Sequence, residues 1–237
     1  MKVNFLKSAT VFVLLSSLLG SCIDTDPDSI GFGDAFIIVE VSGQDTLKGL
    51  GLHAFSYSQF QSVNVHLSTD EQNSYELEPY MGYNQDFVWT TPREEFSTAL
   101  PAAGDYVFNA VFKNDDTDIF YDKLYAGIIK PPVIKEVKFN ASSKALEVSW
   151  ERSVNADAYN VKLLDADGEI LFVSPMFNDY TDSYSFGKNT EGWQVTTYPA
   201  AGEPVKVEVD AYLFEPVAGS RDLQSQGRAY YPIDWVN

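Results

Sequence analysis

From Ala35 onward, apolar and polar residues alternate in short runs, and this alternation most constrains what the chain can fold into. Successive side chains of a strand point to opposite faces, so a period of two indicates half-buried strands. The clearest runs in the first part of the chain are Ala35–Val41, Ser62–Ser68, Asp105–Phe112 and Asp118–Tyr125. Gly, Asn, Asp and Pro separate these runs, as turn residues separate the strands of a sandwich. The sequence therefore predicts an all-β chain built from antiparallel β-sandwiches.

A second series of runs begins at Pro131 and Pro132, which break the chain and mark the predicted domain boundary. Its runs are Pro132–Phe139, Ala145–Trp150, Ala158–Leu164 and Glu169–Val173. Asp167 and Gly168 stand between the last two runs, and this residue pair tolerates the positive φ of a tight hairpin turn. We therefore expect two sandwiches in tandem, in residues 34–131 and 132–237.

Composition and charge exclude several classes of protein. The 237 residues carry 16 Lys+Arg against 34 Asp+Glu, a formal net charge of −18, which repels phosphate groups. We therefore expect no nucleic-acid partner. The aliphatic and aromatic content is too high for a disordered chain, and a single cysteine cannot form a disulfide within the chain.

The N-terminus has the features of a secretory signal. Lys2 and Lys7 precede the apolar run Ala9–Leu19, which is too short to span a bilayer. Leu19-Gly20-Ser21-Cys22 then resembles the lipobox of bacterial lipoproteins. The resemblance implies that residues 1–21 are a signal peptide and that Cys22 is acylated, and several acyl chains hold a protein stably at a membrane. An ordinary cleaved signal followed by a buried cysteine is the alternative.

Residues 22–33 are predicted to form an acidic, solvated tether. The acidic residues are Asp24, Asp26 and Asp28. The segment resembles the export signal of Bacteroidota surface lipoproteins, which implies a lipid-anchored position on the outer face of the outer membrane. The same resemblance implies O-glycosylation at Asp28-Ser29-Ile30 and at Asp45-Thr46-Leu47. Calcium binding by the three aspartates is the alternative, although the Pro-broken run forms no closed oxygen cage.

The second series of runs resembles a fibronectin type III domain. The residues that carry the resemblance are Val148-Ser149-Trp150 as strand B, Ala158–Val161 as strand C and Val205–Ala211 as strand F. The resemblance implies that Trp150 and Tyr159 pack in the core and have a structural role. The sequence departs from the family at Val205, where the family has a corner tyrosine.

The first series resembles an immunoglobulin-like or fibronectin-like domain. Leu100–Ala110 is similar to the loop into strand F, with Tyr106 in the position of the corner tyrosine. Pro101-Ala-Ala-Gly104 recurs as Pro199-Ala-Ala-Gly202, one domain length further along the chain and again before a period-two run. We expect an immunoglobulin-like sandwich in residues 34–131 and a fibronectin type III-like sandwich in residues 132–237.

Side chains suited to catalysis are few. His53 and His66 are the only histidines, and Cys22 is assigned to lipid, so the chain assembles neither a His-rich metal site nor a cysteine nucleophile. Acidic residues are so numerous that no pair stands out, and the separation of a glycosidase pair is set by the fold. We expect no catalytic residue, no metal and no cofactor; a hydrolase with two carboxylates is the weaker alternative.

Aromatic residues outside the alternating runs are the candidate ligand-binding residues. Tyr180, Tyr184 and Trp193 lie in a long polar and aromatic segment, and Trp89 lies in a similar cluster in the first domain. Such rings can stack on a sugar while neighbouring Asn and Asp bond its hydroxyls. The alternative is that these rings face the sandwich cores, where each buries about 150–250 Å².

Two functions remain open at this point. The first is a non-enzymatic outer-membrane lipoprotein that acts as a surface binding or adhesion module for a glycan or a protein partner. The second is a structural or spacer subunit of an outer-membrane assembly, whose sheet edges pair with a neighbouring chain by strand addition. In both, the chain meets the membrane through its lipid anchor.

Overall fold

The structure, a computed structural model, describes residues 28–236. Cys22, Asp24 and Asp26 lie outside this range. The strands of the first half are β1 (Gly31–Ser42), β2 (Asp45–Ser56), β3 (Phe60–Leu67), β4 (Asp70–Tyr80), β5 (Tyr83–Thr90), β6 (Gly104–Phe112) and β7 (Thr117–Leu124), with the short helix η1 (Arg93–Glu95) after β5. Those of the second half are β8 (Val133–Asn140), β9 (Ala145–Glu151), β10 (Ala158–Leu164), β11 (Ile170–Val173), β12 (Phe177–Asn178), β13 (Ser183–Gly187), β14 (Pro204–Phe214) and β15 (Leu223–Asp234).

The first half is a sandwich whose two sheets share the long strand β4. Its first residues pair with β3, and its last residues, Glu78 to Tyr80, pair with β5. The strand order is therefore β1-β2-β5-β4-β3-β6-β7, folded over at β4. The sandwich closes where β7 returns to β1: Asp118 and Asp122 accept hydrogen bonds from the backbone N–H groups of Gly31 and Ala35, at 2.9 and 2.7 Å.

The second half packs the sheet β13-β9-β8 against the strands β11-β10-β14-β15. This places the predicted strand B, β9, in one sheet, and the predicted strands C and F, β10 and β14, side by side in the other, as in a fibronectin type III domain. Trp150 and Tyr159 are buried between the sheets with ring centroids 5.7 Å apart, as the resemblance implies. The chain is thus an all-β protein of two sandwiches, each with its own apolar core.

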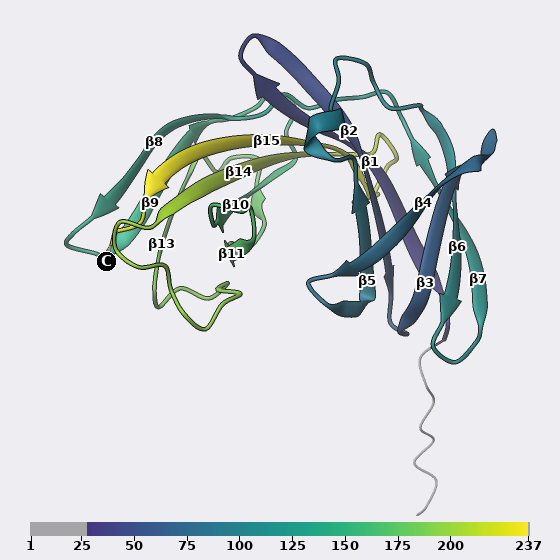
Figure 1. The fold of residues 1–237 in the computed structure, drawn as a ribbon. Coiled ribbons are helices and arrows are strands. Elements are labelled where there is room, and N and C mark those ends of the chain that lie inside the picture. The colour runs from purple at the N-terminus through teal and green to yellow at the C-terminus, as the bar shows by residue number, and fades with distance from the viewer. Residues whose placement is uncertain (1–27, 237) are drawn as a thin grey trace, which may run out of the picture.

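The two halves are joined by a pairing that the sequence does not reveal. β1 lies parallel to β15, with Ile37 opposite Ser225 and Glu40 opposite Arg228. One sheet therefore continues from the first half into the second. Ser225 Oγ also donates a hydrogen bond to the Ile37 carbonyl oxygen at 2.9 Å. Figure 1 shows the result: β14 and β15 reach across to β1 and join the two halves.

The helical content of the described residues is small. Within residues 28–236 the single helix, η1, is three residues long, so no helix there has the length and apolar content needed to cross a bilayer.

Candidate functional site

Polar side chains form a row across the strands on the face of the joined sheet that turns away from the second core. Lys162 on β10, Glu208 on β14 and Tyr230 on β15 are cross-strand neighbours. The adjacent positions are Asp210, Arg228 and, across the junction, Glu40 on β1. Val207 and Val209 alternate with Glu208 and Asp210 along β14. Because side chains alternate along a strand, these valines belong to the core. We call these six residues the polar row.

Lys162 is the centre of the polar row. Its Nζ donates hydrogen bonds to Glu208 Oε1 at 2.8 Å and to Asp210 Oδ2 at 2.6 Å. Burial acts to lower the pKa of Lys162, but the charges of Asp210 and Glu208 outweigh burial and raise this pKa well above its ordinary value. The ammonium therefore stays charged at neutral pH.

The two carboxylates that share Lys162 have different pKa values. Burial, reinforced by the charge of Glu208, raises the pKa of Asp210 to about 6. Burial also acts on Glu208, but the positive charges of Lys162 and Arg228 prevail and hold its pKa below the ordinary value. A small fall from neutral pH therefore protonates Asp210 first.

The Arg228 side chain makes few hydrogen bonds for a half-buried guanidinium. Its Nη2 donates to Gln226 Oε1 at 2.9 Å, and among the described residues no carboxylate forms an ion pair with it. Burial acts to lower its pKa, but Glu208 and Asp210 raise the pKa above its ordinary value, so the group is always charged. Part of the side chain is open to solvent.

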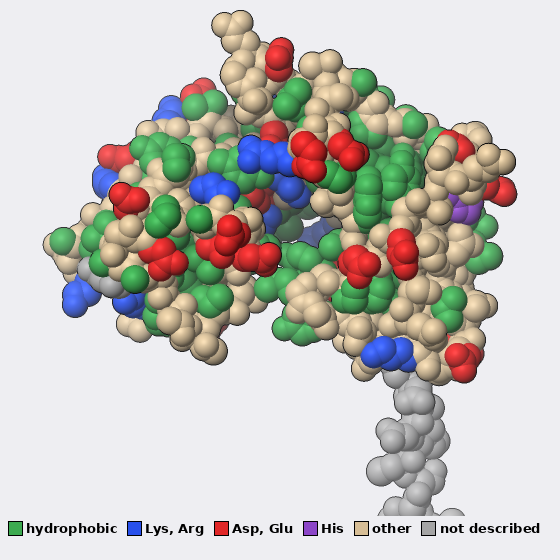
Figure 2. Space-filling model, viewed as in Figure 1, with side chains coloured by type: hydrophobic (Ala, Val, Ile, Leu, Met, Phe, Trp, Pro, Cys, Tyr) green, Lys and Arg blue, Asp and Glu red, His purple; other side chains and the backbone are tan. Residues whose placement is uncertain are grey.

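The first half completes the site with Arg93 on η1 and Tyr80 at the end of β4. Arg93 Nε donates to Glu40 Oε2 at 3.0 Å, while the Tyr230 hydroxyl donates to Glu40 Oε1 at 2.8 Å. The Arg93 guanidinium also lies 5.1 Å from the centre of the Tyr230 ring. Tyr80 and Arg93 line a cavity of about 340 Å³ between the halves, which we call the cleft. The members of the polar row that line it are Lys162, Glu208, Arg228 and Tyr230. Figure 2 shows the hollow with Lys and Arg side chains along its rim, beside acidic ones.

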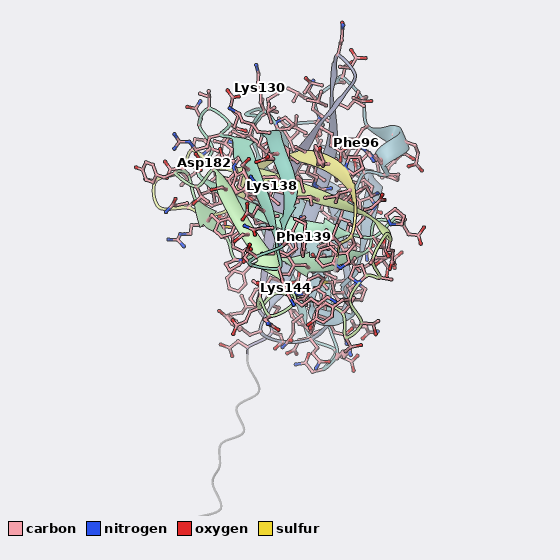
Figure 3. All side chains as sticks on the ribbon, turned by 90° about the vertical axis from the view of Figure 1, so that its left-hand side faces the viewer. Phe96, Lys130, Lys138, Phe139, Lys144 and Asp182 are labelled. Atoms are coloured by element: carbon pink, nitrogen blue, oxygen red, sulfur yellow. The ribbon has the colours of Figure 1, made fainter. Side chains whose placement is uncertain are left out.

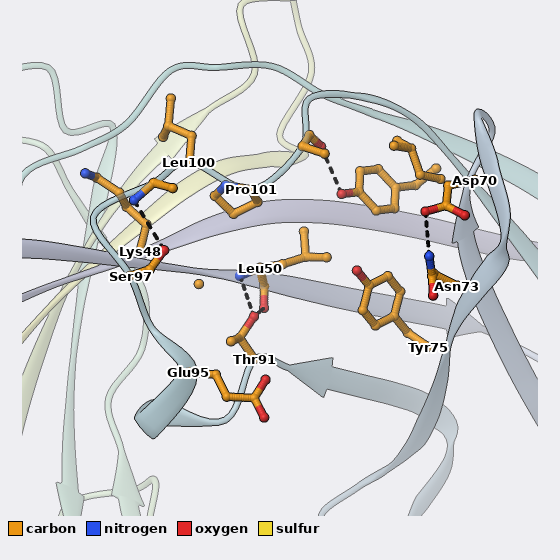
Figure 4. A pocket seen from close by; sticks show the side chains of 15 residues that line it. Lys48, Leu50, Asp70, Asn73, Tyr75, Thr91, Glu95, Ser97, Leu100 and Pro101 are labelled. Carbon is orange, nitrogen blue, oxygen red and sulfur yellow. Dashed lines mark hydrogen bonds between the residues drawn. The ribbon is translucent and has the colours of Figure 1, made fainter.

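A second cavity, of about 260 Å³, lies within the first half (Figure 4). Its polar groups mostly bond to one another. The Tyr106 hydroxyl donates to the carbonyl oxygen of Ala102 at 2.9 Å, which is the corner bond that the resemblance implies, and Asn73 donates to Asp70 Oδ2 at 2.7 Å. Thr91 Oγ1 accepts from the backbone N–H of Leu50 at 2.8 Å. Because these bonds hold the loops together, we take the cleft as the candidate site.

The outer side of the second half offers a contrast to the cleft. Figure 3 looks onto this side, with Lys138, Phe139 and Lys144 spread over the sheet formed by β8, β9 and β13. Lys138 is exposed and donates to Glu136 at 2.9 Å, an ordinary surface ion pair. Lys138 and Lys144 therefore serve as reference positions for charge changes in the cleft.

The structure places the four aromatic residues singled out from the sequence at separate positions. Trp89 is on β5 and packs on Tyr75 at the first core, with ring centroids 4.4 Å apart. Tyr184 and Trp193 pack against the second core. Trp193 Nε1 donates to the Gly187 carbonyl oxygen at 3.0 Å. Tyr180 is 75% exposed, in the turn after β12, so the four rings do not form one surface.

The two histidines have partners of their own. His53 Nε2 lies 2.6 Å from Asp86 Oδ1, and His66 Nδ1 lies 3.4 Å from Asn109 Nδ2. In the part of the chain that the structure describes, no group of three His, Cys, Asp or Glu side chains is placed to hold a metal ion.

No protein-family model matches the sequence, and neither does any curated protein. Among solved structures, the chain is similar to a segment of two fibronectin type III domains from chicken tenascin, at 14% identity over 83% of this chain and 97% of that one, with a TM-score of 0.28. It is also similar to a cytokine receptor complex, at 13% identity over 86% of this chain and 100% of that one, with a TM-score of 0.27. For the BSP domain of a biofilm-associated protein the identity is 14% over 82% of this chain and 29% of that one, with a TM-score of 0.23. The assignment of the fold rests on the strand order and the two cores.

Proposed function

We propose that this chain is a non-enzymatic binding module that holds its ligand in the cleft between its two halves. The observation that carries the proposal is the junction of β1 with β15, which fixes side chains of both halves around one cavity. A site that is already ordered loses little conformational freedom on binding, which favours affinity. The partly exposed Arg228 and the exposed Arg93 are polar groups in such a site that a ligand can reach.

The proposal includes the location of the module. We place it on the outer face of the outer membrane, attached through lipid at Cys22, where it meets glycans or proteins outside the cell. The lipobox-like Leu19–Cys22 and the acidic residues that follow it support this location. Surface binding or adhesion is the role that such a position allows.

The long sheet offers no open end for the spacer role, because both of its ends are covered; among the described residues, the edge strands of the smaller sheet, β8 and β13, pair only with β9. At one end β7 is capped by β1. At the other end the outer edge of β11 is bonded to the loop that follows β13: the Val173 N–H donates to the Gly192 carbonyl, and the Gln194 N–H to the Leu171 carbonyl, both at 2.9 Å. Strand addition needs an open edge.

Binding by the cleft is tested with purified full chain in detergent, on arrays of glycans and surface peptides. Two doubly charge-reversed variants are compared: Arg93→Glu with Lys206→Glu in the cleft, and Lys138→Glu with Lys144→Glu on the outer side. We expect the cleft variant to lose about tenfold or more in affinity, because two cations at the site are lost, and the outer variant to bind as the natural chain does. Equal binding by all three proteins would refute the proposal.

Attachment through Cys22 is tested separately, by growing cells with labelled palmitate. We expect label in the natural chain and none in Cys22→Ser, and we expect protease added to intact cells to digest the natural chain. An unlabelled natural chain, or a chain that protease reaches only after lysis, contradicts the proposed location.

A further inference from the structure

The unpaired charge of the cleft is opposite in sign to that of the chain. The chain carries a net charge of −18. The cations that line the cleft are Arg93, Lys162, Lys206 and Arg228, and the carboxylates that line it are Asp167 and Glu208. Lys162 is paired with Glu208 and Asp210, and Arg93 is paired with Glu40, so these charges are balanced within the protein. Lys206 and Arg228 have no ion pair among the described residues, and the one other carboxylate of the lining is that of Asp167, so the unbalanced charge in the cleft attracts a small anion.

Two cations that line the cleft keep most of their hydrogen-bond donors free. Lys206 makes no hydrogen bond or ion pair with any residue the structure describes, and Arg228 donates only to Gln226. Glu208, by contrast, already accepts from Lys162 at 2.8 Å. The unpaired acceptors nearby, Oδ1 of Asp210 and Oδ1 of Asn160, are buried and do not line the cavity. Among the described residues, the Asp167 carboxylate lines the cleft as a free acceptor at an exposed position. A ligand that accepts hydrogen bonds therefore fits the part of the cleft beside Lys206 and Arg228.

The size and walls of the cleft limit the rest of the ligand. A cavity of about 340 Å³ is at the lower end of the range of small-molecule sites. Tyr80 presents its ring and hydroxyl from the first half, and Leu164 and Ile170 add apolar surface from the second half. Such walls suit a small body with both apolar and hydroxyl-bearing faces.

We infer that the cleft binds an oxyanion carried on a body about the size of one sugar ring. The guanidinium of Arg228 supplies a planar pair of donors for a carboxylate, sulfate or phosphate group, and Lys206 adds charge beside it. The inference rests on the proposed function only in placing the ligand in the cleft. The oxyanion can belong to a free acid or to the terminal residue of an acidic polysaccharide.

The inference is tested by calorimetry and thermal unfolding of the full chain in detergent. The probes are inorganic phosphate, sulfate, citrate and galacturonate, an oligomer ending in galacturonate, and neutral galactose as a control. We expect at least one anion to bind and to raise the Tm, with a Kd that weakens as salt is added, and galactose to do neither. Tight binding of the oligomer alone identifies a polysaccharide end, and binding of the free acid identifies a small metabolite.

Substitutions assign the binding to the cleft. Lys206→Gln, which removes a cation without a partner in the protein, is expected to weaken anion binding about fivefold, and Lys144→Gln on the outer side is expected to leave it unchanged. Arg228→Gln is expected to abolish binding, and Lys206→Gln decides the matter if the Arg228 variant does not fold. Failure of every anion to bind, or equal binding by the Lys206 and Lys144 variants, overturns the inference. A neutral glycan that binds in the cleft would overturn the inference alone and leave the proposed function standing.

Discussion

At the scale of the residue, Lys162 decides whether two carboxylates can remain buried. We expect Lys162→Met to lower the free energy of unfolding by about 3–5 kcal/mol at pH 8, because Glu208 and Asp210 lose the cation that compensates them. Without Lys162 both carboxylates bind protons more readily in the folded chain than in the unfolded one. Stability then falls as pH rises, so the loss is smaller at pH 5. Urea unfolding at the two pH values measures this difference.

The matched control for Lys162 is Lys138→Met. Lys138 pairs with Glu136 on the exposed outer side, so no measurable change is expected at either pH. A Lys162 variant as stable as the Lys138 variant would show that the polar row does not need its cation.

Asp34 gives a second prediction, at the junction of the halves. Burial raises its pKa to about 8, with the charges of Asp122, Asp222 and Glu215 adding to the effect, although it accepts a hydrogen bond from the Leu223 N–H at 2.9 Å. Between about pH 4 and pH 8 the folded chain holds a proton that the unfolded chain has released, so stability falls as pH rises through this window. Because asparagine keeps the acceptor and does not titrate, Asp34→Asn should be more stable at pH 8 by about 1–3 kcal/mol.

The measurement for Asp34 is chemical unfolding of both proteins from pH 5 to pH 8.5. We expect a shallower slope for Asp34→Asn, by about one proton. The remaining slope comes from Glu215 and Asp210, whose pKa values burial raises to about 7 and about 6, and from Asp122, whose pKa burial also raises. Parallel slopes for the two proteins would contradict the assignment.

The sequence predicts where a side chain lies when its neighbours along the chain form its environment. It does not predict this when distant strands form the environment. Trp150, Tyr159 and Tyr106 were placed correctly from their neighbours along the chain. Glu208 and Asp210 lie in the predicted strand F, but the sequence pattern does not indicate that they are buried. That burial depends on Lys162 from β10 and on the strands beside β14, which no local pattern contains.

At the scale of the element, Gly227 on β15 lets the linker between the halves cross the sheet. A Cβ at this position would lie 2.9 Å from the backbone of Pro131, which cannot move aside cheaply. We expect Gly227→Ala to lower the free energy of unfolding by about 1–3 kcal/mol. Gly127→Ala is the control, since its Cβ would meet Gln224 at 3.5 Å, an ordinary contact. Equal stability of the two variants, measured by urea unfolding, would contradict the crossing.

The strands that the sequence misses have compositions that conceal them. β2 contains Gly49 and Gly51, which leave room for the rings of Phe96 and Phe36; a Cβ at either glycine would come within 2.4 Å of the ring above it. β15 begins Leu223-Gln-Ser-Gln-Gly227, a polar run without apolar alternation. β1 supplies a hydrogen-bonding partner to Ser225, and Tyr125 in the segment after β7 supplies one to Gln224. Polar strands of this kind are recognised only when their partners are known.

At the scale of the whole molecule, the continuous sheet should make the two halves unfold together. Trp89 is the tryptophan of the first half, and Trp150, Trp193 and Trp235 belong to the second. With fluorotryptophan incorporated, we expect all the ¹⁹F resonances to lose intensity at the same urea concentration, because unfolding of either half strips a paired edge from the other. Earlier loss of the Trp89 signal alone would show independent domains.

The arrangement of the molecule was only partly predictable. Two sandwiches in tandem follow from the repeated strand patterns, since each pattern closes a core of its own. The cleft does not follow, because it exists only where β1, β15, Arg93 and Tyr80 meet. The aromatic residues chosen from the sequence as ligand contacts stay a prediction, with Tyr180 the one among them that is largely exposed.

The pairing of β1 with β15 also determines how the molecule bears mechanical load. β1 starts at Gly31, close to the N-terminal segment, and is hydrogen-bonded along both sides, to β2 and to β15. A force between the N-terminus and a ligand bound by the second half acts along β1. The hydrogen bonds on the two sides of β1 are then loaded in shear and break together, and they do not open one after another. Resistance of this kind is set by the rate of forced unfolding. For the proposed surface-attached module, the strength of its hold on a ligand in flowing liquid would therefore depend on the shear resistance of β1.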